Sequence, residues 1–320
     1  MRVSVVVPTY RRAGLLDRCL AALAAQDLDP ADYEILIADD AASAETRRQV
    51  EDWARRAGPP VRYLPVHRAH GPAAARNVGW RRARGSIIAF TDDDCIPDPG
   101  WLKAGLHAFT EGVTAVTGRV VVPLPEAPTD YERDAAGLEG GEFVTANCFV
   151  RREILEQVGG FDERFSAAWR EDSDLYFTLL RHGGQIDRVP SALVVHPVRP
   201  ARWGVSLNQQ RKSLFNALLY KKHPRLYRQR IRPWSPWDYY AILIALGLAL
   251  GMWAGGQPRM LKDALAAWVL LTARFCRRRL EQTSRAPGHI IEMIVTSALI
   301  PPLSVFWRLY GALKFRVLFF

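Results

Sequence analysis

Short apolar runs alternate with amphipathic stretches through the first part of this chain. The apolar runs lie at residues 3–7, 33–38, 61–65 and 86–90. A nearly continuous apolar run such as 3–7 is typical of a strand in a parallel sheet, because both faces of such a sheet are covered, and the other three runs are predicted as strands as well. Between them, apolar residues recur at helical spacing and predict helices at residues 13–26, 44–57 and 72–84. The alternation predicts βαβ units and a mostly parallel α/β sheet.

The pattern is less regular between residues 100 and 200. A helix is expected directly after Gly100, and two more at residues 152–158 and 171–182. Further strands are expected at residues 113–122, 143–150 and 192–195. The segment 123–141 is rich in Pro, Gly and acidic residues, so we expect a mobile loop there.

Polar residues follow three of the predicted strands: Pro8-Thr9-Tyr10, Asp39-Asp40 and Asp92-Asp93-Asp94. The carboxyl ends of parallel strands meet at one edge of a sheet, where α/β proteins bind their ligands. Three adjacent carboxylates repel one another unless they are paired or bind a cation. Strand alternation would place Asp92 and Asp94 on one side, where they could hold a divalent cation. The alternative is a solvated acidic turn.

Two familiar nucleotide-binding motifs are missing from the sequence. There is no G-x-x-x-x-G-K phosphate loop, and no G-x-G-x-x-G follows the first strand. Both absences count against a P-loop nucleotidase and against a Rossmann dehydrogenase.

Charge is distributed unevenly over the 320 residues. The net charge is +10, yet residues 199–232 contain ten Lys or Arg and no acidic residue. This segment predicts a negatively charged partner, which can be nucleic acid, anionic lipid or a phosphorylated acceptor. Its aromatic and apolar neighbours fit a membrane better than nucleic acid, so no nucleic-acid partner is expected.

The cysteines and the N-terminal residues indicate the compartment. The four cysteines are far apart and form no C-x-x-C pair, which is typical of reduced thiols in a cytosolic domain. The apolar run at the start of the sequence is too short for a signal peptide. We therefore expect the N-terminal domain to lie in the cytoplasm.

The last third of the chain has the pattern of membrane-associated helices. Residues 239–256 contain no charge and are near the lower length limit for a membrane span. Residues 264–275 could form a hairpin with them, and the following Arg277-Arg278-Arg279 would place that flank in the cytoplasm. Residues 290–307, interrupted by Pro301-Pro302, can be re-entrant, interfacial or a kinked span. The alternative is a buried hairpin or an oligomer interface.

Taken in order, the motifs resemble those of inverting family 2 glycosyltransferases of the GT-A fold. The resemblance covers residues 1–200 and rests on Val5-Val6-Val7-Pro8-Thr9-Tyr10, Asp39-Asp40, Ala75-Arg76-Asn77-Val78-Gly79, Thr91-Asp92-Asp93-Asp94, Gly159-Gly160-Phe161-Asp162-Glu163 and Glu171-Asp172-Ser173-Asp174-Leu175. The order and spacing of these motifs are more specific than any one of them. The sequence departs from the family at Ala41-Ala42, where many members have Gly-Ser. The implied fold is a GT-A Rossmann-like sheet flanked by helices, followed by an α-helical membrane-associated region.

The resemblance implies a site for a nucleotide sugar that is linked to UDP, GDP or dTDP. Its residues would be Pro8, Thr9, Tyr10, Asp39, Arg76, Asp92 and Asp93. Asp39 would accept hydrogen bonds from the nucleoside, or it caps the following helix instead. Arg76 would reach the diphosphate or the aspartates, or it is an ordinary surface arginine.

The resemblance also implies a cation and a catalytic base. Mn²⁺ or Mg²⁺ would be held by Asp94, with Asp92 and His196 as further ligands. His196 can equally be a structural residue after a strand. The base that deprotonates the acceptor hydroxyl would be Asp172, with Glu171 as the second choice. The alternative for this acidic pair is stabilisation of a helix N-terminus.

Three residues are candidates for acceptor contacts. Trp169 could cover a sugar face, or it belongs to the core. Processive relatives have a Q-x-x-R-W motif, and the nearest match ends in Lys212-Ser213 instead, which disfavours processive synthesis. Arg211 and Lys212 could bind a lipid diphosphate, or they only add membrane-surface charge.

Together these observations predict three parts: a nucleotide-sugar glycosyltransferase domain at 1–200, a basic acceptor or membrane-surface segment at 201–237, and membrane-associated helices at 238–320. The expected activity is inverting, metal-dependent transfer of a single hexose-type sugar to a lipid-linked or cell-envelope glycan acceptor at the cytoplasmic membrane. The alternatives are a nucleotidyltransferase of sugar phosphates and a non-catalytic membrane-surface protein. The former usually has a Gly-rich basic loop after the first strand, where this chain has Pro8-Thr9-Tyr10.

Overall fold

An eight-stranded mixed sheet forms the centre of the N-terminal part in a computed structural model that describes residues 1–319. The strands lie in the order β3-β2-β1-β4-β7-β6-β8-β5. Their bounds are β1 (Val3–Thr9), β2 (Tyr33–Asp39), β3 (Val61–Pro65), β4 (Ile87–Phe90), β5 (Ile96–Pro97), β6 (Val113–Val121), β7 (Cys148–Arg151) and β8 (Gln185–Val195). Strands β1 to β4 pair in parallel, as does β6 with β8, whereas β7 is antiparallel to both of its neighbours. The predicted mostly parallel α/β sheet is confirmed.

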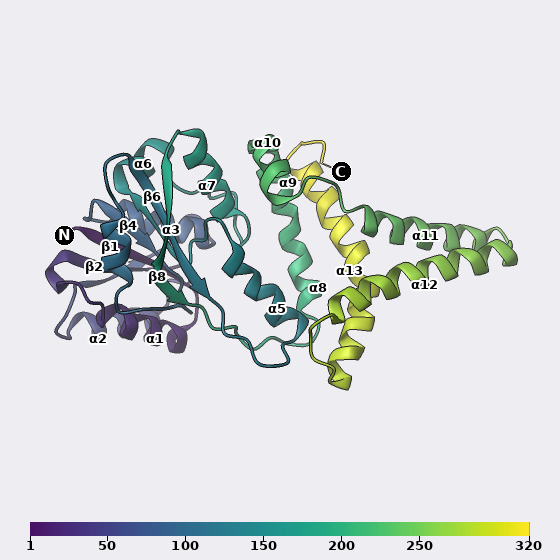
Figure 1. The fold of residues 1–320 in the computed structure, drawn as a ribbon, viewed down its shortest axis with the longest axis horizontal. Coiled ribbons are helices and arrows are strands. Elements are labelled where there is room, and N and C mark those ends of the chain that lie inside the picture. Colours follow the sequence, from purple (N-terminus) through teal and green to yellow (C-terminus); the bar gives the residue numbers. More distant parts are fainter. Residues whose placement is uncertain (320) are drawn as a thin grey trace. The chain divides into compact units, whose positions relative to one another are not determined.

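Helices cover both faces of this sheet because its strands are apolar on both sides. One core cluster joins Val3, Val5 and Val7 to α1 (Ala13–Ala24), α2 (Ala44–Ala54) and α4 (Trp101–His107). The opposite cluster joins Val6 and Phe90 to α3 (Pro72–Arg81), α6 (Arg152–Val158) and α7 (Glu171–Arg181). Alternate residues of β1 therefore contact opposite helix layers, which Figure 1 shows on the two sides of the sheet.

By its internal contacts the chain separates into two compact units. The first unit consists of Met1–Pro123 and Ala136–Val198, and it contains the whole sheet. The second consists of Leu124–Ala135 and Arg199–Phe320. The functional division at residues 200 and 237 stays a prediction.

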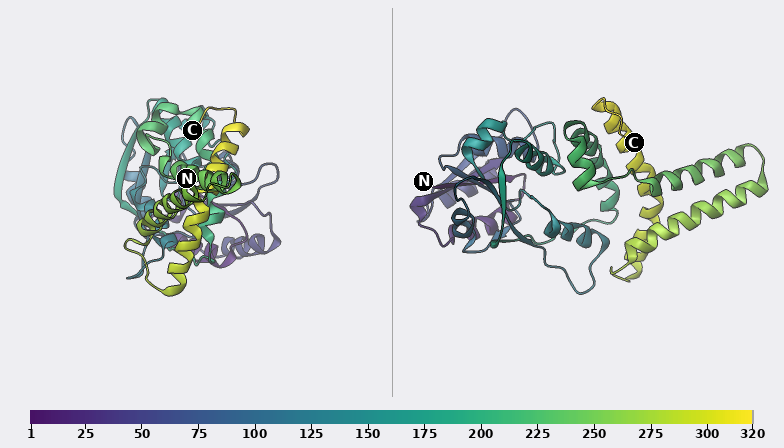
Figure 2. Two further views of the ribbon diagram at one scale, coloured as in Figure 1. Left: turned by 90° about the vertical axis from the view of Figure 1, so that its right-hand side faces the viewer. Right: turned by 45° about the horizontal axis from the view of Figure 1, so that its top comes forward.

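The second unit is helical. Its helices are α5 (Asp130–Ala136), α8 (Val205–Gln209), α9 (Leu214–Lys222), α10 (Pro224–Leu226), α11 (Trp237–Ala254), α12 (Pro258–Leu280) and α13 (Pro287–Lys314), with the short turns η3 (Gln210–Ser213) and η4 (Tyr227–Ile231). Helices α11 and α12 form an antiparallel hairpin that projects away from α13 (Figure 1 and Figure 2). By length and composition alone, α11 and α13 could each cross a membrane.

Two expectations about local structure were wrong. The segment 123–141 is not a continuous loop, because it contains α5 and the single turn η2 (Gly137–Gly140). Strand β7 begins at Cys148 rather than at residue 143. Helix α13 continues through Pro301 and Pro302, although each proline lacks the N–H that would bond to the preceding turn.

The contact of α3 with β1 can be tested with a single methyl group. A Cβ at Gly79 would lie 2.3 Å from Val6 Cγ1, in a fully buried position. We expect Gly79→Ala to lower the free energy of unfolding by about 1–3 kcal/mol through overpacking, despite the better helix propensity of alanine. The measurement is the thermal unfolding midpoint of the full chain in detergent.

Gly14→Ala is the matched control, because a Cβ at Gly14 would have no neighbour within 4 Å. It should leave the midpoint unchanged or raise it slightly. Equal midpoints for the two variants would contradict the close packing of α3 against β1.

Candidate active site

The three aspartates after β4 lie in a turn, because the strand ends at Phe90. Strand alternation therefore does not govern the directions of their side chains, and this part of the sequence argument was wrong. Each carboxylate instead has a different partner: Arg76 for Asp92, Thr9 and Arg12 for Asp93, and His196 for Asp94. Separate partners relieve the repulsion between the three charges.

Asp93 connects the turn to the end of β1. Its carboxylate accepts hydrogen bonds from Thr9 Oγ1 at 2.8 Å and from Arg12 Nη1 at 3.1 Å. Burial raises the pKa of Asp93, while Arg12 acts in the opposite direction. Asp93 thus fixes the first turn of α1 and the β4 turn at the same sheet edge.

Arg76 connects the turn to the start of α7. This fully enclosed side chain donates to Asp92 Oδ1 at 2.8 Å and to Glu171 Oε1 at 3.0 Å. It is therefore not a surface arginine. Burial opposes ionisation of Asp92, but Arg76, His196 and Arg12 together outweigh burial and leave the pKa of Asp92 below its usual range.

Asp94 and His196 meet where β4 and β8 end. His196 Nε2 lies 3.4 Å from Asp94 Oδ1, and both side chains are largely buried. Ligand atoms of Asp94, Cys95 and His196 all lie within 4.8 Å of one another. Burial raises the pKa of the Cys95 thiol, and the Asp92 and Asp94 charges raise it further. Without a bound cation this shift keeps the thiol protonated, so the Asp94 oxygen and the His196 imidazole nitrogen are the donors best suited to a hard divalent cation.

Asp39 ends β2 and is fully buried. Its carboxylate accepts hydrogen bonds from the backbone N–H of Ala41 and Ser43 and from the Tyr63 hydroxyl, at 2.8–3.0 Å. The N-cap of α2 is Ser43, so Asp39 is not itself the cap of this helix and the helix-cap alternative is wrong. Asp39 instead orders the loop between β2 and α2, and nucleoside binding by Asp39 stays a prediction.

The remaining nucleotide candidates lie at the end of β1. Pro8 is the penultimate residue of the strand, and Tyr10 follows it with half of its surface exposed. The Arg11 guanidinium lies 5.4 Å from the centre of the Tyr10 ring. An exposed aromatic ring beside a cation offers a stacking surface at this edge.

Glu171 and Asp172 begin α7, directly after Arg170, whose φ of 75° is unusual for a residue with a side chain. Burial raises the pKa of Glu171 to about 7, although Arg76 opposes the shift. Burial also raises the pKa of Asp172, whose carboxylate accepts from the Ser173 N–H at 2.6 Å. The Arg170 guanidinium covers the half-exposed Trp169 ring at 4.6 Å, so Trp169 is not a core residue.

Asn77 is an important residue whose role the sequence reasoning missed. This buried amide donates to the Phe161 carbonyl and to Glu163 Oε1, each at 2.8 Å. Its oxygen accepts from the Phe161 N–H at 3.0 Å and from Trp80 Nε1 at 2.8 Å. Asn77 therefore fastens α3 to the Gly159–Glu163 turn. The adjacency of Asn77 to Arg76 in a shared motif was the available signal.

Arg211 and Lys212 belong to η3 of the second unit. Arg211 is exposed, and its guanidinium lies 5.8 Å from the centre of the Trp307 ring. Lys212 is half-buried and acts electrostatically on Asp134 of the same unit. Acceptor binding by this pair stays a prediction.

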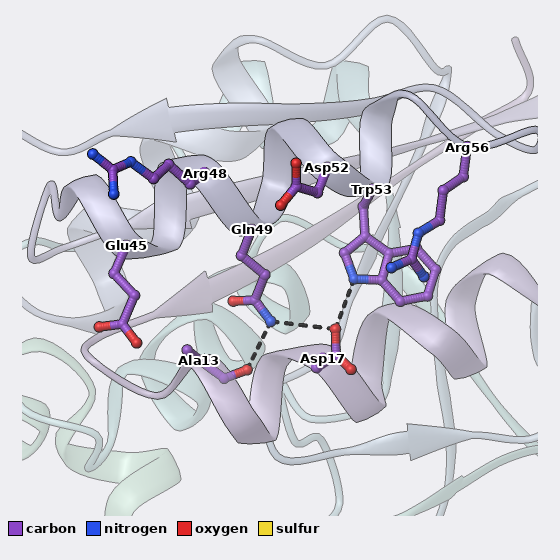
Figure 3. A pocket seen from close by; sticks show the side chains of 8 residues that line it. All are labelled: Ala13, Asp17, Glu45, Arg48, Gln49, Asp52, Trp53 and Arg56. Atoms are coloured by element: carbon purple, nitrogen blue, oxygen red, sulfur yellow. Dashed lines mark hydrogen bonds between the residues drawn. The ribbon is translucent and has the colours of Figure 1, made fainter.

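A depression of about 460 Å³ lies between α1 and α2 (Figure 3). Its polar side chains bond to one another: Gln49 donates to the Ala13 carbonyl, and Trp53 Nε1 donates to Asp17, each at 2.8 Å. None of the predicted site residues lines it. We attribute it to helix packing rather than to substrate binding.

Comparison with known families identifies the class of protein. Residues 4–165 match the family described as "Glycosyl transferase family 2", and residues 87–277 match "Glycosyl transferase family group 2". The chain therefore belongs to glycosyl transferase family 2 and is a glycosyltransferase. This assignment confirms the resemblance found in the motifs, and it favours sugar transfer over nucleotidyl transfer.

Curated relatives are about a quarter identical to this chain over the aligned residues. The glycosyltransferase AglE of Haloferax volcanii is 28% identical over 80% of this chain and 82% of that protein. Validoxylamine A glucosyltransferase of Streptomyces hygroscopicus subsp. limoneus is 26% identical over 70% of this chain but only 57% of its own length. A Campylobacter jejuni relative, GalNAc(5)-diNAcBac-PP-undecaprenol beta-1,3-glucosyltransferase, is 28% identical over 47% of each chain.

Solved structures confirm the GT-A-like fold. Mannosyltransferase PcManGT from Pyrobaculum calidifontis, in complex with GDP-Man and Mn²⁺, has a TM-score of 0.57 and 22% identity. The match covers 98% of this chain and 87% of that one. S. aureus TarS 1-349 in complex with UDP-GlcNAc has a TM-score of 0.54 and 16% identity, over 97% and 92% of the two chains.

The raised pKa of Glu171 predicts a pH-dependent contribution to stability. Between pH 4.5, its ordinary pKa, and about 7, folded Glu171 holds a proton that the unfolded chain has released. Raising the pH through this window therefore favours unfolding. We expect Glu171→Gln to lose less stability than wild type between pH 4.5 and 7.5, measured as thermal midpoints.

Glu156→Gln is the control, since Glu156 is an exposed carboxylate that pairs with Arg152 on α6. Its midpoints should follow the wild-type pH dependence. Parallel curves for wild type and Glu171→Gln would show that Glu171 titrates like a solvated carboxylate.

Proposed function

We propose that this glycosyltransferase is an inverting, metal-dependent, hexosyl-type enzyme. It transfers one sugar from a nucleotide sugar to a lipid-linked or cell-envelope acceptor at the cytoplasmic face of the membrane. The observation that carries the proposal is the Arg76 bridge. A buried guanidinium that contacts both Asp92 and Glu171 brings the acidic turn and the acidic start of α7 to one place. Sugar transfer with inversion needs a leaving-group site and a base on opposite sides of one carbon.

The donor is a nucleotide sugar. Two structural neighbours are complexes with GDP-Man and with UDP-GlcNAc, which supports nucleotide-diphosphate sugars as a class. We assign the nucleoside and diphosphate to the edge formed by Pro8, Thr9, Tyr10 and Asp39. Thr9 and Asp39 occupy paired positions at the ends of β1 and β2. The β4 turn with Asp92 and Asp93 lies beside Thr9, where Asp93 accepts its hydrogen bond.

The donor set fits a divalent cation. Asp94 and His196 would hold it, and an oxygen with an imidazole nitrogen suits Mn²⁺ well and Mg²⁺ less well. The buried His196 Nδ1 has no hydrogen-bond partner among residues 1–319, so the ring is held only by the contact of Nε2 with Asp94. Asp92 is not in the group of adjacent ligands found among residues 1–319, and its carboxylate accepts a hydrogen bond from Arg76. Ligation of the cation by Asp92 therefore stays a prediction. When bound, the cation offsets the charge of the leaving nucleoside diphosphate.

Asp172 is the proposed base. Burial raises its pKa, which strengthens its affinity for the proton of an acceptor hydroxyl. Glu171 is less suited to this role because Arg76 engages its carboxylate. Arg76 instead positions Glu171, and with it the first turn of α7. Trp169 lies just before this turn, where an exposed indole can cover the acceptor sugar.

The acceptor is proposed to be anionic and membrane-bound. The name of the C. jejuni relative includes PP-undecaprenol, a lipid diphosphate. In the second unit, the exposed Arg211 and the half-buried Lys212 offer cations for such a group.

The first experiment measures nucleotide release from UDP-, GDP- and dTDP-sugars with Mn²⁺, Mg²⁺ or EDTA, with membranes as the acceptor source. We expect release with one donor and with a divalent cation only. Asp172→Asn should reduce the rate by about 10²–10⁴-fold because proton removal is lost. Asp94→Ala should abolish the response to metal.

The control is Asp52→Asn, which removes an exposed carboxylate that pairs only with Arg55 on α2. It should keep the wild-type rate. Cation-independent release, or full activity of Asp172→Asn, would refute the proposed roles. Absence of both release and metal-dependent nucleotide binding would favour a non-catalytic membrane protein.

Arg76→Lys tests whether Arg76 positions Glu171 and the first turn of α7. Lysine has no planar fork and cannot donate to Asp92 and Glu171 in the same geometry. We expect kcat to fall by about 100-fold with a smaller change in KM, since misplaced catalytic groups lower the rate of the chemical step. Arg81→Lys, at an exposed position of α3, should be neutral. A rise in KM alone would instead indicate that Arg76 mainly binds the donor.

A further inference from the structure

Helix α13 exposes apolar side chains and buries several polar ones alongside apolar Met293, Ile300 and Val305, unlike a helix of a water-soluble protein. The strongly exposed side chains between residues 289 and 313 are all apolar or aromatic: Ile291, Ile294, Val295, Leu299, Phe306, Leu309, Tyr310 and Leu313. Its buried side chains include His289, Thr296, Ser297 and Arg308. A helix in water buries its apolar side, so the exposed side of α13 requires an apolar environment.

The polar face of α13 is committed to the protein interior. Arg279 of α12 donates to Thr296 Oγ1 at 2.7 Å and to Ser297 Oγ at 3.1 Å. The same guanidinium pairs with Asp130 of α5 at 2.7 Å. Because these groups satisfy one another, α13 cannot rotate to expose its polar side without leaving a buried charge unpaired.

A basic segment accompanies α13 along most of its length. The Gly204 N–H donates to Glu292 at 2.7 Å near the start of α13, and Lys221 Nζ donates to the Phe315 carbonyl at 2.8 Å after its end. Between these points, a Cβ at Gly311 would lie 2.5 Å from the Leu214 carbonyl oxygen. Segment 204–222 therefore follows α13 in the same direction, in direct backbone contact.

This companion segment decides how α13 can meet a membrane. It carries Arg211, Lys212, Lys221 and Lys222, of which Arg211 and Lys221 are exposed. If α13 crossed the bilayer, the segment would cross with it and bring these cations into the hydrocarbon, which is strongly unfavourable. By length and hydropathy, α13 is a candidate membrane span, as is α11. The packing of α13 against segment 204–222 argues against a span.

Helix α11 packs along α12 instead, whose charged residues lie near its two ends and not at residues 264–273, and α11 itself is almost entirely apolar. Its 18 residues extend about 27 Å at about 1.5 Å per residue, close to the thickness of the hydrocarbon core. Trp237 and Trp253 mark its two ends, and both are largely exposed. Such a pair is typical of residues at the two membrane–water interfaces. Helix α12 returns antiparallel to α11 (Figure 2).

The charge of the second unit specifies the kind of membrane. The unit contains 21 Lys or Arg and eight Asp or Glu, a net charge of +13, whereas the first unit has a net charge of −3. The basic residues flank the hairpin, with Arg232 before α11 and Arg277-Arg278-Arg279 at the end of α12. A leaflet rich in anionic headgroups is the complementary surface.

We propose that α13 lies along the surface of an anionic leaflet with its apolar side among the acyl chains, and that only the α11–α12 hairpin crosses the bilayer. The chain then enters and leaves the membrane on the same side, which keeps segment 204–222 and the end of α12 on one face. Neither part of the proposal depends on sugar transfer, so its test stands even if no donor is found.

The test measures the depth of spin labels in lipid vesicles. Single cysteines are introduced into the full chain at Ile291, Leu299 and Leu309 on α13, and at Leu248 in the middle of α11. All four positions are exposed, and the native cysteines are buried, so labelling of the wild-type chain is the background control. The vesicles contain phosphatidylcholine with phosphatidylglycerol, and depth is read from power saturation with oxygen and a nickel chelate. Thermal midpoints confirm that each variant is folded.

We expect the three α13 labels to share one shallow depth, within about 5–10 Å of the headgroups, and the Leu248 label to lie near the bilayer centre. In a spanning α13, the labels at 291 and 309 would be about 27 Å apart along the membrane normal, with Leu299 deepest. That profile, or α13 labels exposed to water, would overturn the surface placement. A shallow Leu248 label would overturn the crossing hairpin.

The second arm repeats the depth measurement in pure phosphatidylcholine and in 0.5 M salt. If anionic headgroups hold α13, its labels should move toward water in both conditions, because the attraction is lost or screened. The Leu248 label should keep its depth. An unchanged α13 depth in both conditions would show that the apolar face alone places the helix and would overturn the anionic part of the proposal.

Discussion

The buried Arg76 guanidinium is the interaction on which the geometry of this site depends. It lies between the turn after β4 and the start of α7, and it donates to a carboxylate of each. A guanidinium removed from water needs such partners, and the two carboxylates need it equally, because each would otherwise be an uncompensated buried charge. The three groups therefore hold one another in place, and three separate elements are fixed with them. Asp92 stays easily ionised because His196 and Arg12 add to the Arg76 charge, whereas burial and the neighbouring Asp172 charge raise the pKa of Glu171.

Neighbouring contacts extend this rigidity to the rest of the sheet edge. Asn77, the next residue of α3, uses both its oxygen and its amide nitrogen to hold the Gly159–Glu163 turn. Asp93 accepts hydrogen bonds from Thr9 and Arg12, so the end of β1 cannot shift independently of the acidic turn. A glycosyltransferase has to place a donor and an acceptor within bonding distance of each other. The site residues therefore lie on strand ends and helix starts whose positions are determined by buried polar pairs.

The accuracy of the sequence predictions followed the strength of the local signal. Strands such as Val3–Thr9 were predictable because a nearly continuous apolar run has few alternatives. Predictions failed where tertiary contacts overrode local preference. The Pro- and Gly-rich segment 123–141 forms α5, whose Asp130 pairs with Arg279, a residue 149 positions away in the sequence. Helix α13, for which a kinked span was one of the open alternatives, continues through Pro301 because its packing within the second unit outweighs the cost of a missing hydrogen bond.

The sequence by itself determined the family, the alternation of strands and helices, and the concentration of acidic residues at the strand ends. These features depend on the order and spacing of residue types, which can be read directly. Only the tertiary structure decided which side chain pairs with each aspartate, that Arg76 is buried, and which face of α13 is exposed. Those outcomes depend on contacts between residues far apart in the chain. Burial converts such contacts into strong constraints, because polar groups that are removed from water must find partners wherever the fold provides them.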